Sequence, residues 1–173
     1  KFDGVDLILG PEMKSTGEVM GIDDNFLSSY IKSQIACGNI LPSKGNVFIS
    51  IDDDNKESIV SIAKKLQNLK FNLVATKGTA KMLNDKGIIT KQINKVKEGN
   101  PHIVDSLTNN EIDLVINTTK SQSSVRDSYG IRRTSLMYNI PYYTTIAGAK
   151  VAVDAIEYIE KNDFKIKSLQ TIN

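Results

Sequence analysis

The sequence has few of the residues on which most catalytic and metal sites depend. Its 173 residues include one cysteine, Cys37, and one histidine, His102. A single cysteine excludes a disulfide within the chain and fits a reducing compartment, so we expect a cytoplasmic protein with Cys37 partly buried. A histidine-based metal site or a Ser-His-Asp triad would have to use His102, which we expect to be an ordinary loop residue after Pro101.

Strong charge, long apolar runs and common nucleotide motifs are also missing. The 22 basic and 20 acidic residues give a net charge of +2, which does not favour nucleic acid or an anionic membrane. The apolar runs are far too short to span a bilayer. Neither a Gly-x-x-x-x-Gly-Lys-Ser/Thr loop nor a Gly-x-Gly-x-x-Gly loop is present. No acidic or histidine cluster has metal-ligand spacing, and Asp52 to Asp54 are expected to form a solvated loop and helix cap.

The composition that remains is that of one globular domain, with 40% hydrophobic residues. About the first 24 residues are turn-rich and contain no amphipathic helix. Because the chain begins with Lys1 and has no signal segment, we expect it to be part of a longer protein. From Asn25 to Ala36 the apolar residues recur at helical spacing, and Asp24 is the expected N-cap.

Beyond Pro42 strands and helices alternate, which predicts an α/β fold with helices on both faces of a central, mostly parallel five-stranded sheet, a three-layer sandwich. We expect Val151, Ala155, Ile156 and Ile159 to face the core. The expected strands are 46–51, 71–76, one within 87–94, 112–117 and 141–144, with an additional edge strand over 166–169. The expected helices are 54–68, 79–85, 103–109, 123–139 and 146–161.

Hydrogen-bond donors gather where the expected strands end. In open α/β sheets ligands bind beyond the carboxyl ends of the strands, so these positions are the first candidates for a site. Ammonium, hydroxyl and amide groups suit phosphate or carboxylate. We therefore predict a small-anion pocket. Its candidate residues are Lys56, Thr76, Gly78, Thr79, Lys95, Asn117, Thr118, Thr119 and Thr144.

The turn Thr76-Lys-Gly-Thr79 is the most suggestive of these strand ends. Backbone N–H groups at a helix N-terminus lack intrahelical partners and carry the positive end of the helix dipole. Gly78 would let an anion approach the backbone, and two threonines add hydroxyl donors. Alone, the turn fits a plain helix cap equally well, and only the neighbouring strand ends favour an anion.

The predicted helix after the fourth strand contributes two further groups of polar residues. Asp127 and Ser128 lie near enough to the expected pocket to bind a ribose or an amine. Arg132 and Arg133 are expected on a solvated face of the same helix.

Several segments together resemble one family. They are Gly10-Pro-Glu-Met-Lys-Ser-Thr-Gly-Glu-Val-Met-Gly21, Ala75-Thr-Lys-Gly-Thr79, Asn94-Lys-Val-Lys-Glu-Gly-Asn-Pro-His-Ile103, Ile116-Asn-Thr-Thr119 and Asp127-Ser with Ile131-Arg-Arg133. Over essentially its whole length the chain resembles the carboxyl-terminal end of the carbamoyl phosphate synthase large subunit. The resemblance implies that residues 1–24 are the tail of the preceding ATP-grasp unit. Residues 25–173 would be the allosteric domain, with the methylglyoxal synthase fold.

The resemblance also implies a function. The parent enzyme would be a glutamine-hydrolysing, ATP-dependent ligase that makes carbamoyl phosphate for pyrimidine and arginine synthesis, using ATP with Mg²⁺ and K⁺ in its ATP-grasp units. This piece would hold no catalytic residue, metal or cofactor. UMP and IMP would bind it at an overlapping site, and ornithine would bind at the boundary with the preceding domain. Its partners would be the rest of the large subunit, the glutaminase small subunit and a further copy of this domain.

The family's nucleotide-phosphate positions match donors already selected from the strand ends, and its ornithine-side threonine matches Thr144. Two departures change the charge of the expected pocket. Lys77 stands where the family often has histidine, and Lys120-Ser121-Gln122-Ser123 stands where it often has Ser-Gly-Arg-Arg. The matching phosphate positions are Lys56, Thr76, Thr79, Lys95, Asn117, Thr118 and Thr119, with Asp127 and Ser128 nearby.

Two enzymes with the same type of turn are alternatives. A methylglyoxal synthase needs a carboxylate base beside its phosphate site, and its Gly-Gly-Asp segment would fall on Glu98-Gly-Asn-Pro-His102, where no aspartate stands. Glu98 is a poor substitute by position. An inosinate cyclohydrolase domain would lack the Gly10 to Gly21 segment. A structural or oligomerisation role is compatible with the regulatory one.

Overall fold

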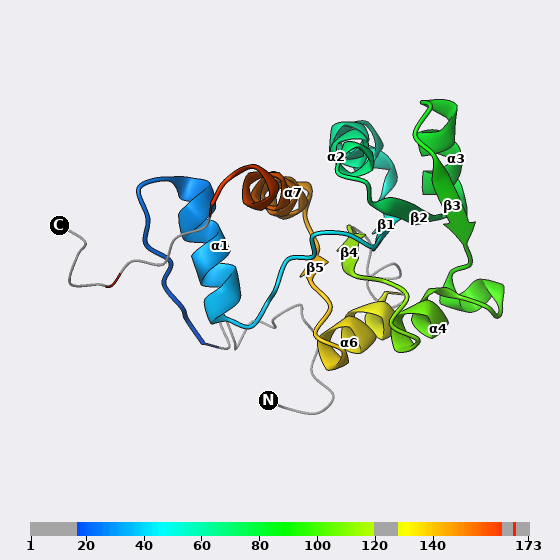
Figure 1. The fold of residues 1–173 in the computed structure, drawn as a ribbon. Coiled ribbons are helices and arrows are strands. Elements are labelled where there is room, and N and C mark those ends of the chain that lie inside the picture. The colour runs from blue at the N-terminus through cyan, green and yellow to red at the C-terminus, as the bar shows by residue number, and fades with distance from the viewer. Residues whose placement is uncertain (1–16, 120–127, 164–167, 169–173) are drawn as a thin grey trace.

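The computed structural model describes residues 17–119, 128–163 and 168. Helices and strands alternate in them as the sequence predicts (Figure 1). The strands are β1 (Asn46–Ser50), β2 (Asn72–Thr76), β3 (Thr90–Ile93), β4 (Leu114–Asn117) and β5 (Tyr142–Tyr143). The helices are α1 (Phe26–Ala36), α2 (Lys56–Asn68), α3 (Lys77–Asp85), α4 (Ile103–Thr108), α6 (Tyr129–Met137) and α7 (Ile146–Lys161), with short 3-10 turns η1 (Asp53–Asn55) and η2 (Val96–Glu98).

The five strands form one parallel sheet in the order β3-β2-β1-β4-β5. The central strand β1 pairs with β2 on one side and with β4 on the other. Val47, Phe48 and Ile49 of β1 have no exposed surface, and all of β4 is buried. This burial on both faces is why these strands read as continuous apolar runs, and it confirms the predicted fold class.

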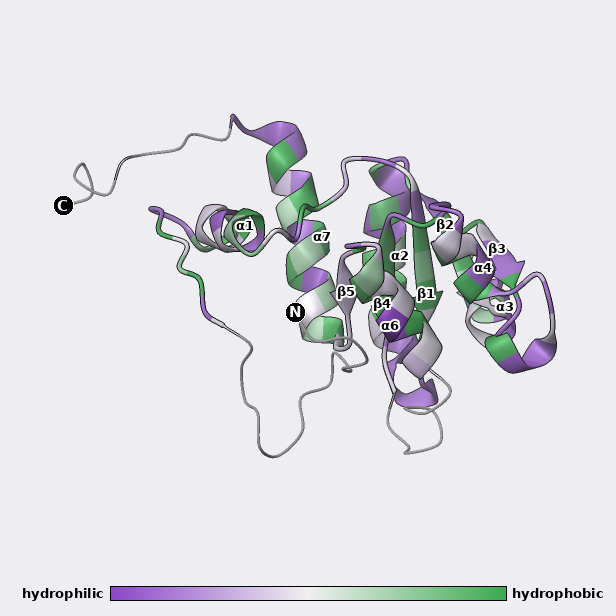
Figure 2. Cartoon of the chain, turned by 90° about the horizontal axis from the view of Figure 1, so that it is seen from below, coloured by the Kyte–Doolittle hydropathy of each residue, from purple (hydrophilic) through white to green (hydrophobic). Residues whose placement is uncertain are grey.

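Two apolar clusters lie on opposite faces of the sheet because side chains alternate along a strand. Val47 and Ile49 belong to the cluster beneath α2, α3 and α7, whereas Phe48 belongs to the cluster beneath α4 and α6. The helices accordingly form a layer on each side of the sheet in Figure 1. In Figure 2 the central strand β1 is hydrophobic and the edge strand β3 is largely hydrophilic, so the core lies under the middle of the sheet.

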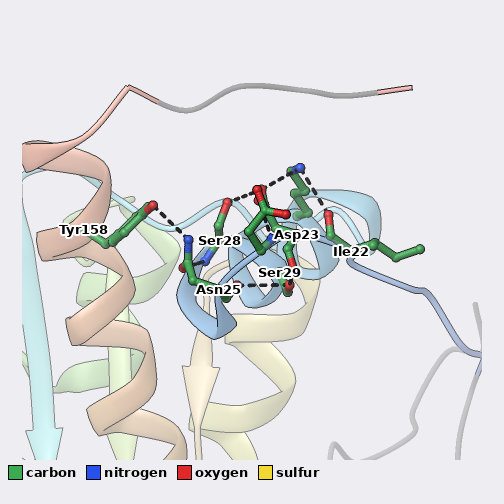
Figure 3. A network of polar contacts seen from close by, with 8 residues as sticks. Ile22, Asp23, Asn25, Ser28, Ser29 and Tyr158 are labelled. Atoms are coloured by element: carbon green, nitrogen blue, oxygen red, sulfur yellow. Dashed lines mark hydrogen bonds and ion pairs between the residues drawn. The ribbon is translucent and has the colours of Figure 1, made fainter. Parts of the chain in front are cut away.

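Helix α1 packs against α7, at the side of the domain away from β3 (Figure 1). The residues just before it are tied to it by a polar network (Figure 3). The Asp23 carboxylate accepts a hydrogen bond from Ser28 and lies 2.7 Å from the Lys32 ammonium. Asn25 Nδ2 donates to the Tyr158 hydroxyl of α7 at 3.2 Å. Residues from Asp23 onward are thus continuous with α1, while the predicted boundary at residue 24 stays a prediction.

Several helix ends differ from the expected ones for local reasons. Asn25, not Asp24, is the N-cap of α1, since its side chain accepts from the Ser28 amide at 2.9 Å. Helix α3 begins at Lys77 rather than at Thr79, because Thr76 takes the extended N-cap conformation. The expected helix 123–139 is described as α6 from Tyr129 onward, and residues 123–127 lie outside the described residues. The expected edge strand over 166–169 also lies outside them, except for Ser168, which is in no strand.

Three expectations about burial are wrong. Ile159 is 37% exposed, because it lines a cavity of about 250 Å³ between the end of α7 and Leu41 and Pro42. Cys37 is exposed at the C-cap of α1. Arg132 is 1% exposed rather than solvated.

The burial of Arg132 has a simple geometric reason. Ser128, Ile131, Arg132 and Ser135 are all buried, and they recur at i, i+3, i+4 and i+7, the spacing of one helix face. The neighbouring Arg133 lies on the opposite side and is exposed. Arg132 is therefore a core residue of α6, on an inward face whose only apolar member among these four is Ile131.

No helix among the described residues is long and apolar enough to cross a membrane.

Candidate functional site

The order in which strands are added to the sheet reverses between β1 and β4. From β1 the chain moves outward to β2 and β3, then returns to the other side of β1 for β4 and β5. Ligands of open α/β sheets bind at such a switch point, beyond the carboxyl ends of the strands. Ser50 at the end of β1 lies beside Asn117 at the end of β4. The segments that follow these two residues therefore meet at the switch point.

A pocket of about 250 Å³ occupies this position. It brings together six of the predicted residues from β2, β4, the start of α6 and the turn before η2. These six are Thr76, Lys95, Asn117, Thr118, Thr119 and Ser128. The remaining lining residues are Ser50, Ile51, Asp52, Val96, Lys97, Glu98 and Ile131.

The other predicted residues lie elsewhere. Lys56, in the first turn of α2, forms an ion pair of 2.5 Å with Asp53 and does not line the pocket. Thr79 is buried, and its hydroxyl accepts a hydrogen bond from the Ile51 amide at 3.4 Å. Thr79 thus ties α3 to the end of β1. Thr144 is exposed after β5 and does not line the pocket.

Gly78 lies in the first turn of α3, and a Cβ atom added to it would meet nothing within 4 Å, so its surface is open. Lys77 beside it is exposed. Asp127 and the segment 120–123 lie outside the described residues.

Thr76 lies at the N-cap of α3 but does not cap it. Its side chain is 4% exposed, lines the pocket and makes no hydrogen bond to the first turn of the helix. Thr145 occupies the same position before α7, and there the hydroxyl accepts from the Gly148 amide at 3.1 Å. The ordinary capping bond is thus present at α7 and missing at α3. The Thr76 hydroxyl is therefore left to face the pocket, whereas Lys77, Gly78 and Thr79 of the first turn are not among the residues that line it.

Thr118 and Asp52 join the two strand ends across the switch point. The Thr118 hydroxyl donates to Asp52 Oδ2 at 2.7 Å and accepts from the Asp52 amide at 3.2 Å. The Asp52 carboxylate also accepts from Asn55, which confirms the predicted cap. The Thr118 hydroxyl therefore already donates its hydrogen to Asp52 and holds the pocket lining together.

Asn117 is held from behind the pocket. Its side chain is 1% exposed, and its Nδ2 donates to the Tyr142 hydroxyl at 2.7 Å. Tyr142 belongs to β5 and does not line the pocket. The sequence gives no signal for this contact, because it depends on β5 pairing with β4.

Charges of both signs line the pocket. Lys95 and Lys97 stand opposite two carboxylates, those of Asp52 and Glu98, and the Lys95 amide donates to Glu98 at 2.8 Å. The formal charges balance, so an anion would be bound mainly by oriented donors, with the lysines close by. Neither acid was predicted as a pocket residue, although Asp52 directly follows β1 and the strand-end rule reaches it.

His102 does not belong to the pocket. It is the N-cap of α4: its amide donates to the Asp105 carboxylate at 2.9 Å, and its Nδ1 accepts from the Asp105 amide at 3.4 Å. Among the described residues, no group of three or more His, Cys, Asp and Glu could hold a metal ion. His102 thus has a structural role at the start of a helix.

A larger open groove of about 940 Å³ runs along the edge strand β3. It extends from Asn46 and Asn72, at the amino ends of β1 and β2, past Lys91 to Asn94, just after β3. It does not lie at the switch point between β1 and β4, which makes it a poorer candidate than the smaller pocket.

Comparisons with known proteins agree with this architecture. Residues 58–144 match the MGS-like domain family. The carbamoyl phosphate synthase large chain of Myxococcus xanthus (strain DK1622) is 49% identical over 170 residues, which are 98% of this chain and 16% of that protein. The carbamoyl phosphate synthase large chain, C-terminal section, of Methanopyrus kandleri (strain AV19) is 49% identical over 174 residues, 100% of this chain and 32% of that protein. The chain therefore spans about a sixth and about a third of these two relatives.

One solved structure is also similar. The methylglyoxal synthase from Elizabethkingia anophelis NUHP1 aligns with a TM-score of 0.49 and 19% sequence identity, over 65% of this chain and 79% of that one.

Proposed function

This chain belongs to the MGS-like domain family, and we propose that it is the regulatory domain of a carbamoyl phosphate synthase large chain that binds a nucleotide monophosphate in the pocket at the switch point. UMP and IMP are the proposed effectors, and they compete for the same residues. The relatives that cover nearly the whole chain are named as large chains of that enzyme.

The observation that carries the proposal is the uncapped Thr76 hydroxyl before α3. Thr76 leaves its capping bond unmade and faces the same pocket as Lys95 and Ser128. A phosphate dianion accepts hydrogen bonds from backbone amides and hydroxyls and is stabilised by the positive end of a helix. A phosphomonoester therefore matches the donors of this pocket better than a neutral ligand does.

The volume of the pocket limits which part of a nucleotide it can enclose. Pockets that enclose drug-sized ligands commonly measure about 300–1,000 Å³, whereas this pocket has about 250 Å³. It suits the phosphate and part of the ribose. We propose that Ser128, at the N-cap of α6, and its sequence neighbour Asp127 bind the ribose. Lys56, Gly78 and Thr79 would then support the site from around α2 and α3.

An enzymatic function of the same pocket is less well supported. Both lining carboxylates accept hydrogen bonds from neighbouring groups, Asp52 from Thr118 and Glu98 from the Lys95 amide. Such bonds use oxygens that a base would need to reach a substrate. Incubation of the chain with dihydroxyacetone phosphate tests the alternative, and clear production of methylglyoxal would contradict the regulatory proposal.

The proposal extends to the parent protein. That protein would form carbamoyl phosphate from bicarbonate, glutamine-derived ammonia and ATP, with Mg²⁺ and K⁺ bound in its ATP-grasp units. The rest of the large subunit, a glutaminase subunit and further copies of the chain would be its partners. Ornithine would bind on the side of Thr144, which is exposed at the end of β5.

Regulation would follow from differential binding. An effector shifts the equilibrium between two conformations by no more than the difference in its affinities for them, typically about 1–3 kcal/mol. The chain alone should therefore bind an effector, whereas a change of catalytic rate requires the whole enzyme.

A calorimetric screen of the chain against UMP, IMP, ornithine and N-acetylglutamate tests the proposal. We expect saturable binding of UMP or IMP, competition between the two and a rise in melting temperature with either one. The absence of binding by both nucleotides at millimolar concentration would contradict it.

A further inference from the structure

We propose that Tyr142 is a positioning residue of this pocket, acting through Asn117 from outside the lining. The inference rests on the proposed function of the pocket and assigns it a residue that the strand-end pattern does not reach. Asn117 lines the pocket and is 1% exposed. Its Nδ2 lies 2.7 Å from the Tyr142 hydroxyl, a short and well-formed bond between two buried or half-buried side chains.

The phenol ring is fixed by the fold. Tyr142 pairs with Val115 of β4, and it packs against the apolar cluster that contains Phe48 and Ile131. The Tyr142 side chain also borders a small cavity of about 220 Å³, which Ser135 and Ile140 line as well. A ring held in this way gives the hydroxyl a fixed position behind Asn117.

A fixed hydroxyl determines what Asn117 offers to a ligand. A side-chain amide is planar, with its donor and its acceptor on opposite sides, so a partner at one end sets the direction of the other. The Tyr142 hydroxyl accepts one hydrogen of Asn117 Nδ2, so the directions of the amide oxygen and of the second hydrogen are fixed. Without the hydroxyl, ligand binding would have to order the Asn117 amide, and this cost reduces affinity.

The chain contains a matched control one residue away. Successive side chains of a strand point to opposite faces, and Tyr143 accordingly packs in the other apolar cluster. Its hydroxyl accepts from Tyr30 of α1 at 3.1 Å and donates to Gln34 at 3.5 Å. Tyr143→Phe thus removes the same atom from the same strand without touching the pocket.

The test is a set of dissociation constants for UMP and IMP, measured by calorimetry at one pH and salt concentration. The variants are Tyr142→Phe, Tyr143→Phe, Asn117→Ala and the double variant Asn117→Ala/Tyr142→Phe. Urea denaturation of each variant verifies that it is folded, and the amide resonances of Asn117 in an NMR spectrum report its hydrogen bond without ligand.

We expect Tyr142→Phe to weaken binding by about five- to tenfold, the effect of one neutral hydrogen bond. The same substitution should have no effect beyond twofold when Asn117 is already alanine, because the hydroxyl acts through that side chain. Tyr143→Phe should lower the urea midpoint and leave affinity within twofold of the wild type. In the wild type the Asn117 resonances should differ clearly from those in Tyr142→Phe.

Other outcomes are decisive against the inference. Equal losses of affinity in Tyr142→Phe and Tyr143→Phe, or an undiminished Tyr142 effect in the Asn117→Ala background, would show a general disturbance of β5. Unchanged affinity in Tyr142→Phe with a normal wild type would overturn the inference and leave the proposed function intact. A wild-type chain that binds neither nucleotide would overturn both.

Discussion

The hydroxyl of Thr118 and the carboxylate of Asp52 are joined by a hydrogen bond of 2.7 Å that links the end of β4 to the segment after β1. A second bond returns from the Asp52 amide to the same hydroxyl at 3.2 Å. The order of strands in the sheet reverses between β1 and β4, and this pair of bonds holds the ends of these two strands together at the pocket. A residue predicted as a ligand contact is therefore first a structural residue.

Replacement of Thr118 by valine should separate these two roles. Thr118→Val removes the hydroxyl and leaves two half-buried Asp52 groups with one partner fewer, so the free energy of unfolding should fall by about 1–3 kcal/mol. Thr119→Val, at the adjacent and less buried position, should change it by no more than about 0.5 kcal/mol. Urea denaturation measures both values, and equal effects would contradict the assigned role of Thr118.

Two lysines that the sequence analysis treated alike should differ in binding. Lys95 lines the pocket, whereas Lys56 is paired with Asp53 outside it. Lys95→Ala should weaken UMP or IMP binding by about 1.5–3 kcal/mol, the contribution of a charge-assisted contact. Lys56→Ala should alter affinity less than twofold. If calorimetry finds the larger loss in Lys56→Ala, the phosphate lies nearer to α2 than we propose.

Two N-cap threonines provide a second matched pair. Thr145 makes its capping bond and Thr76 does not. Thr145→Ala should lower the free energy of unfolding by about 1 kcal/mol and leave nucleotide affinity unchanged. Thr76→Ala should do the reverse and abolish the thermal shift caused by UMP or IMP. A purely destabilising effect of Thr76→Ala would mean that Thr76 is an ordinary cap.

Adjacent arginines on α6 should differ in their effect on stability. Arg132 is 1% exposed and Arg133 is exposed. Arg132→Ala removes a buried charge from its partners and should lower the free energy of unfolding by about 3–5 kcal/mol. Arg133→Ala should change it by no more than about 0.5 kcal/mol. Similar urea midpoints for the two variants would contradict the packing described for α6.

The network before α1 should make stability depend on acid pH (Figure 3). Hydrogen bonds from Lys32, Ser28 and the Asp24 amide hold the pKa of Asp23 well below its usual range. A depressed carboxyl pKa stabilises the fold above the unfolded-state pKa of about 4, and this contribution disappears as the pH falls further. Asp23→Asn should therefore lower the urea midpoint at pH 7.

The difference in urea midpoint between the wild type and Asp23→Asn should shrink steadily once the pH falls below about 4. Protonation of the Asp23 carboxyl in the unfolded wild type then removes the stability that the charged carboxylate contributes. Asp85→Asn, at an exposed position on α3, serves as the control and should follow the wild type at every pH. A constant difference between the wild type and Asp23→Asn over the whole range would contradict the role of the Asp23 charge.

Much of the fold could be predicted because the signals are local. Alternation of apolar strands and amphipathic helices predicted the layers and the strand ends within a few residues, and the strand-end rule selected five residues that the structure brings to one pocket. The rule was wrong for a residue whose side chain is paired with a neighbour outside the pocket. Lys56 follows β1 in sequence, but its position in the first turn of α2 places it beside Asp53.

Burial was harder to predict for polar residues on the inward face of a helix. The buried residues from Ser128 to Ser135 form one stripe along α6, and the charge of Arg132 led to the wrong expectation that its side chain is solvated. The contact of Tyr142 with Asn117 could not be predicted for a different reason. It depends on which strand pairs with β4, and local periodicity does not specify strand order.

The sequence by itself determined the parallel α/β architecture, the donors at the strand ends and the family resemblance, because periodicity and turn composition are local properties of the chain. Only the tertiary structure decided which of these donors face a common pocket and which are tied elsewhere. That decision rests on the return of the chain from β3 to the far side of β1, which brings Thr76, Asn117 and Asp52 together from distant parts of the sequence. Side chains drawn together in this way acquire partners, such as Asp52 for Thr118 and Tyr142 for Asn117, that no local pattern specifies.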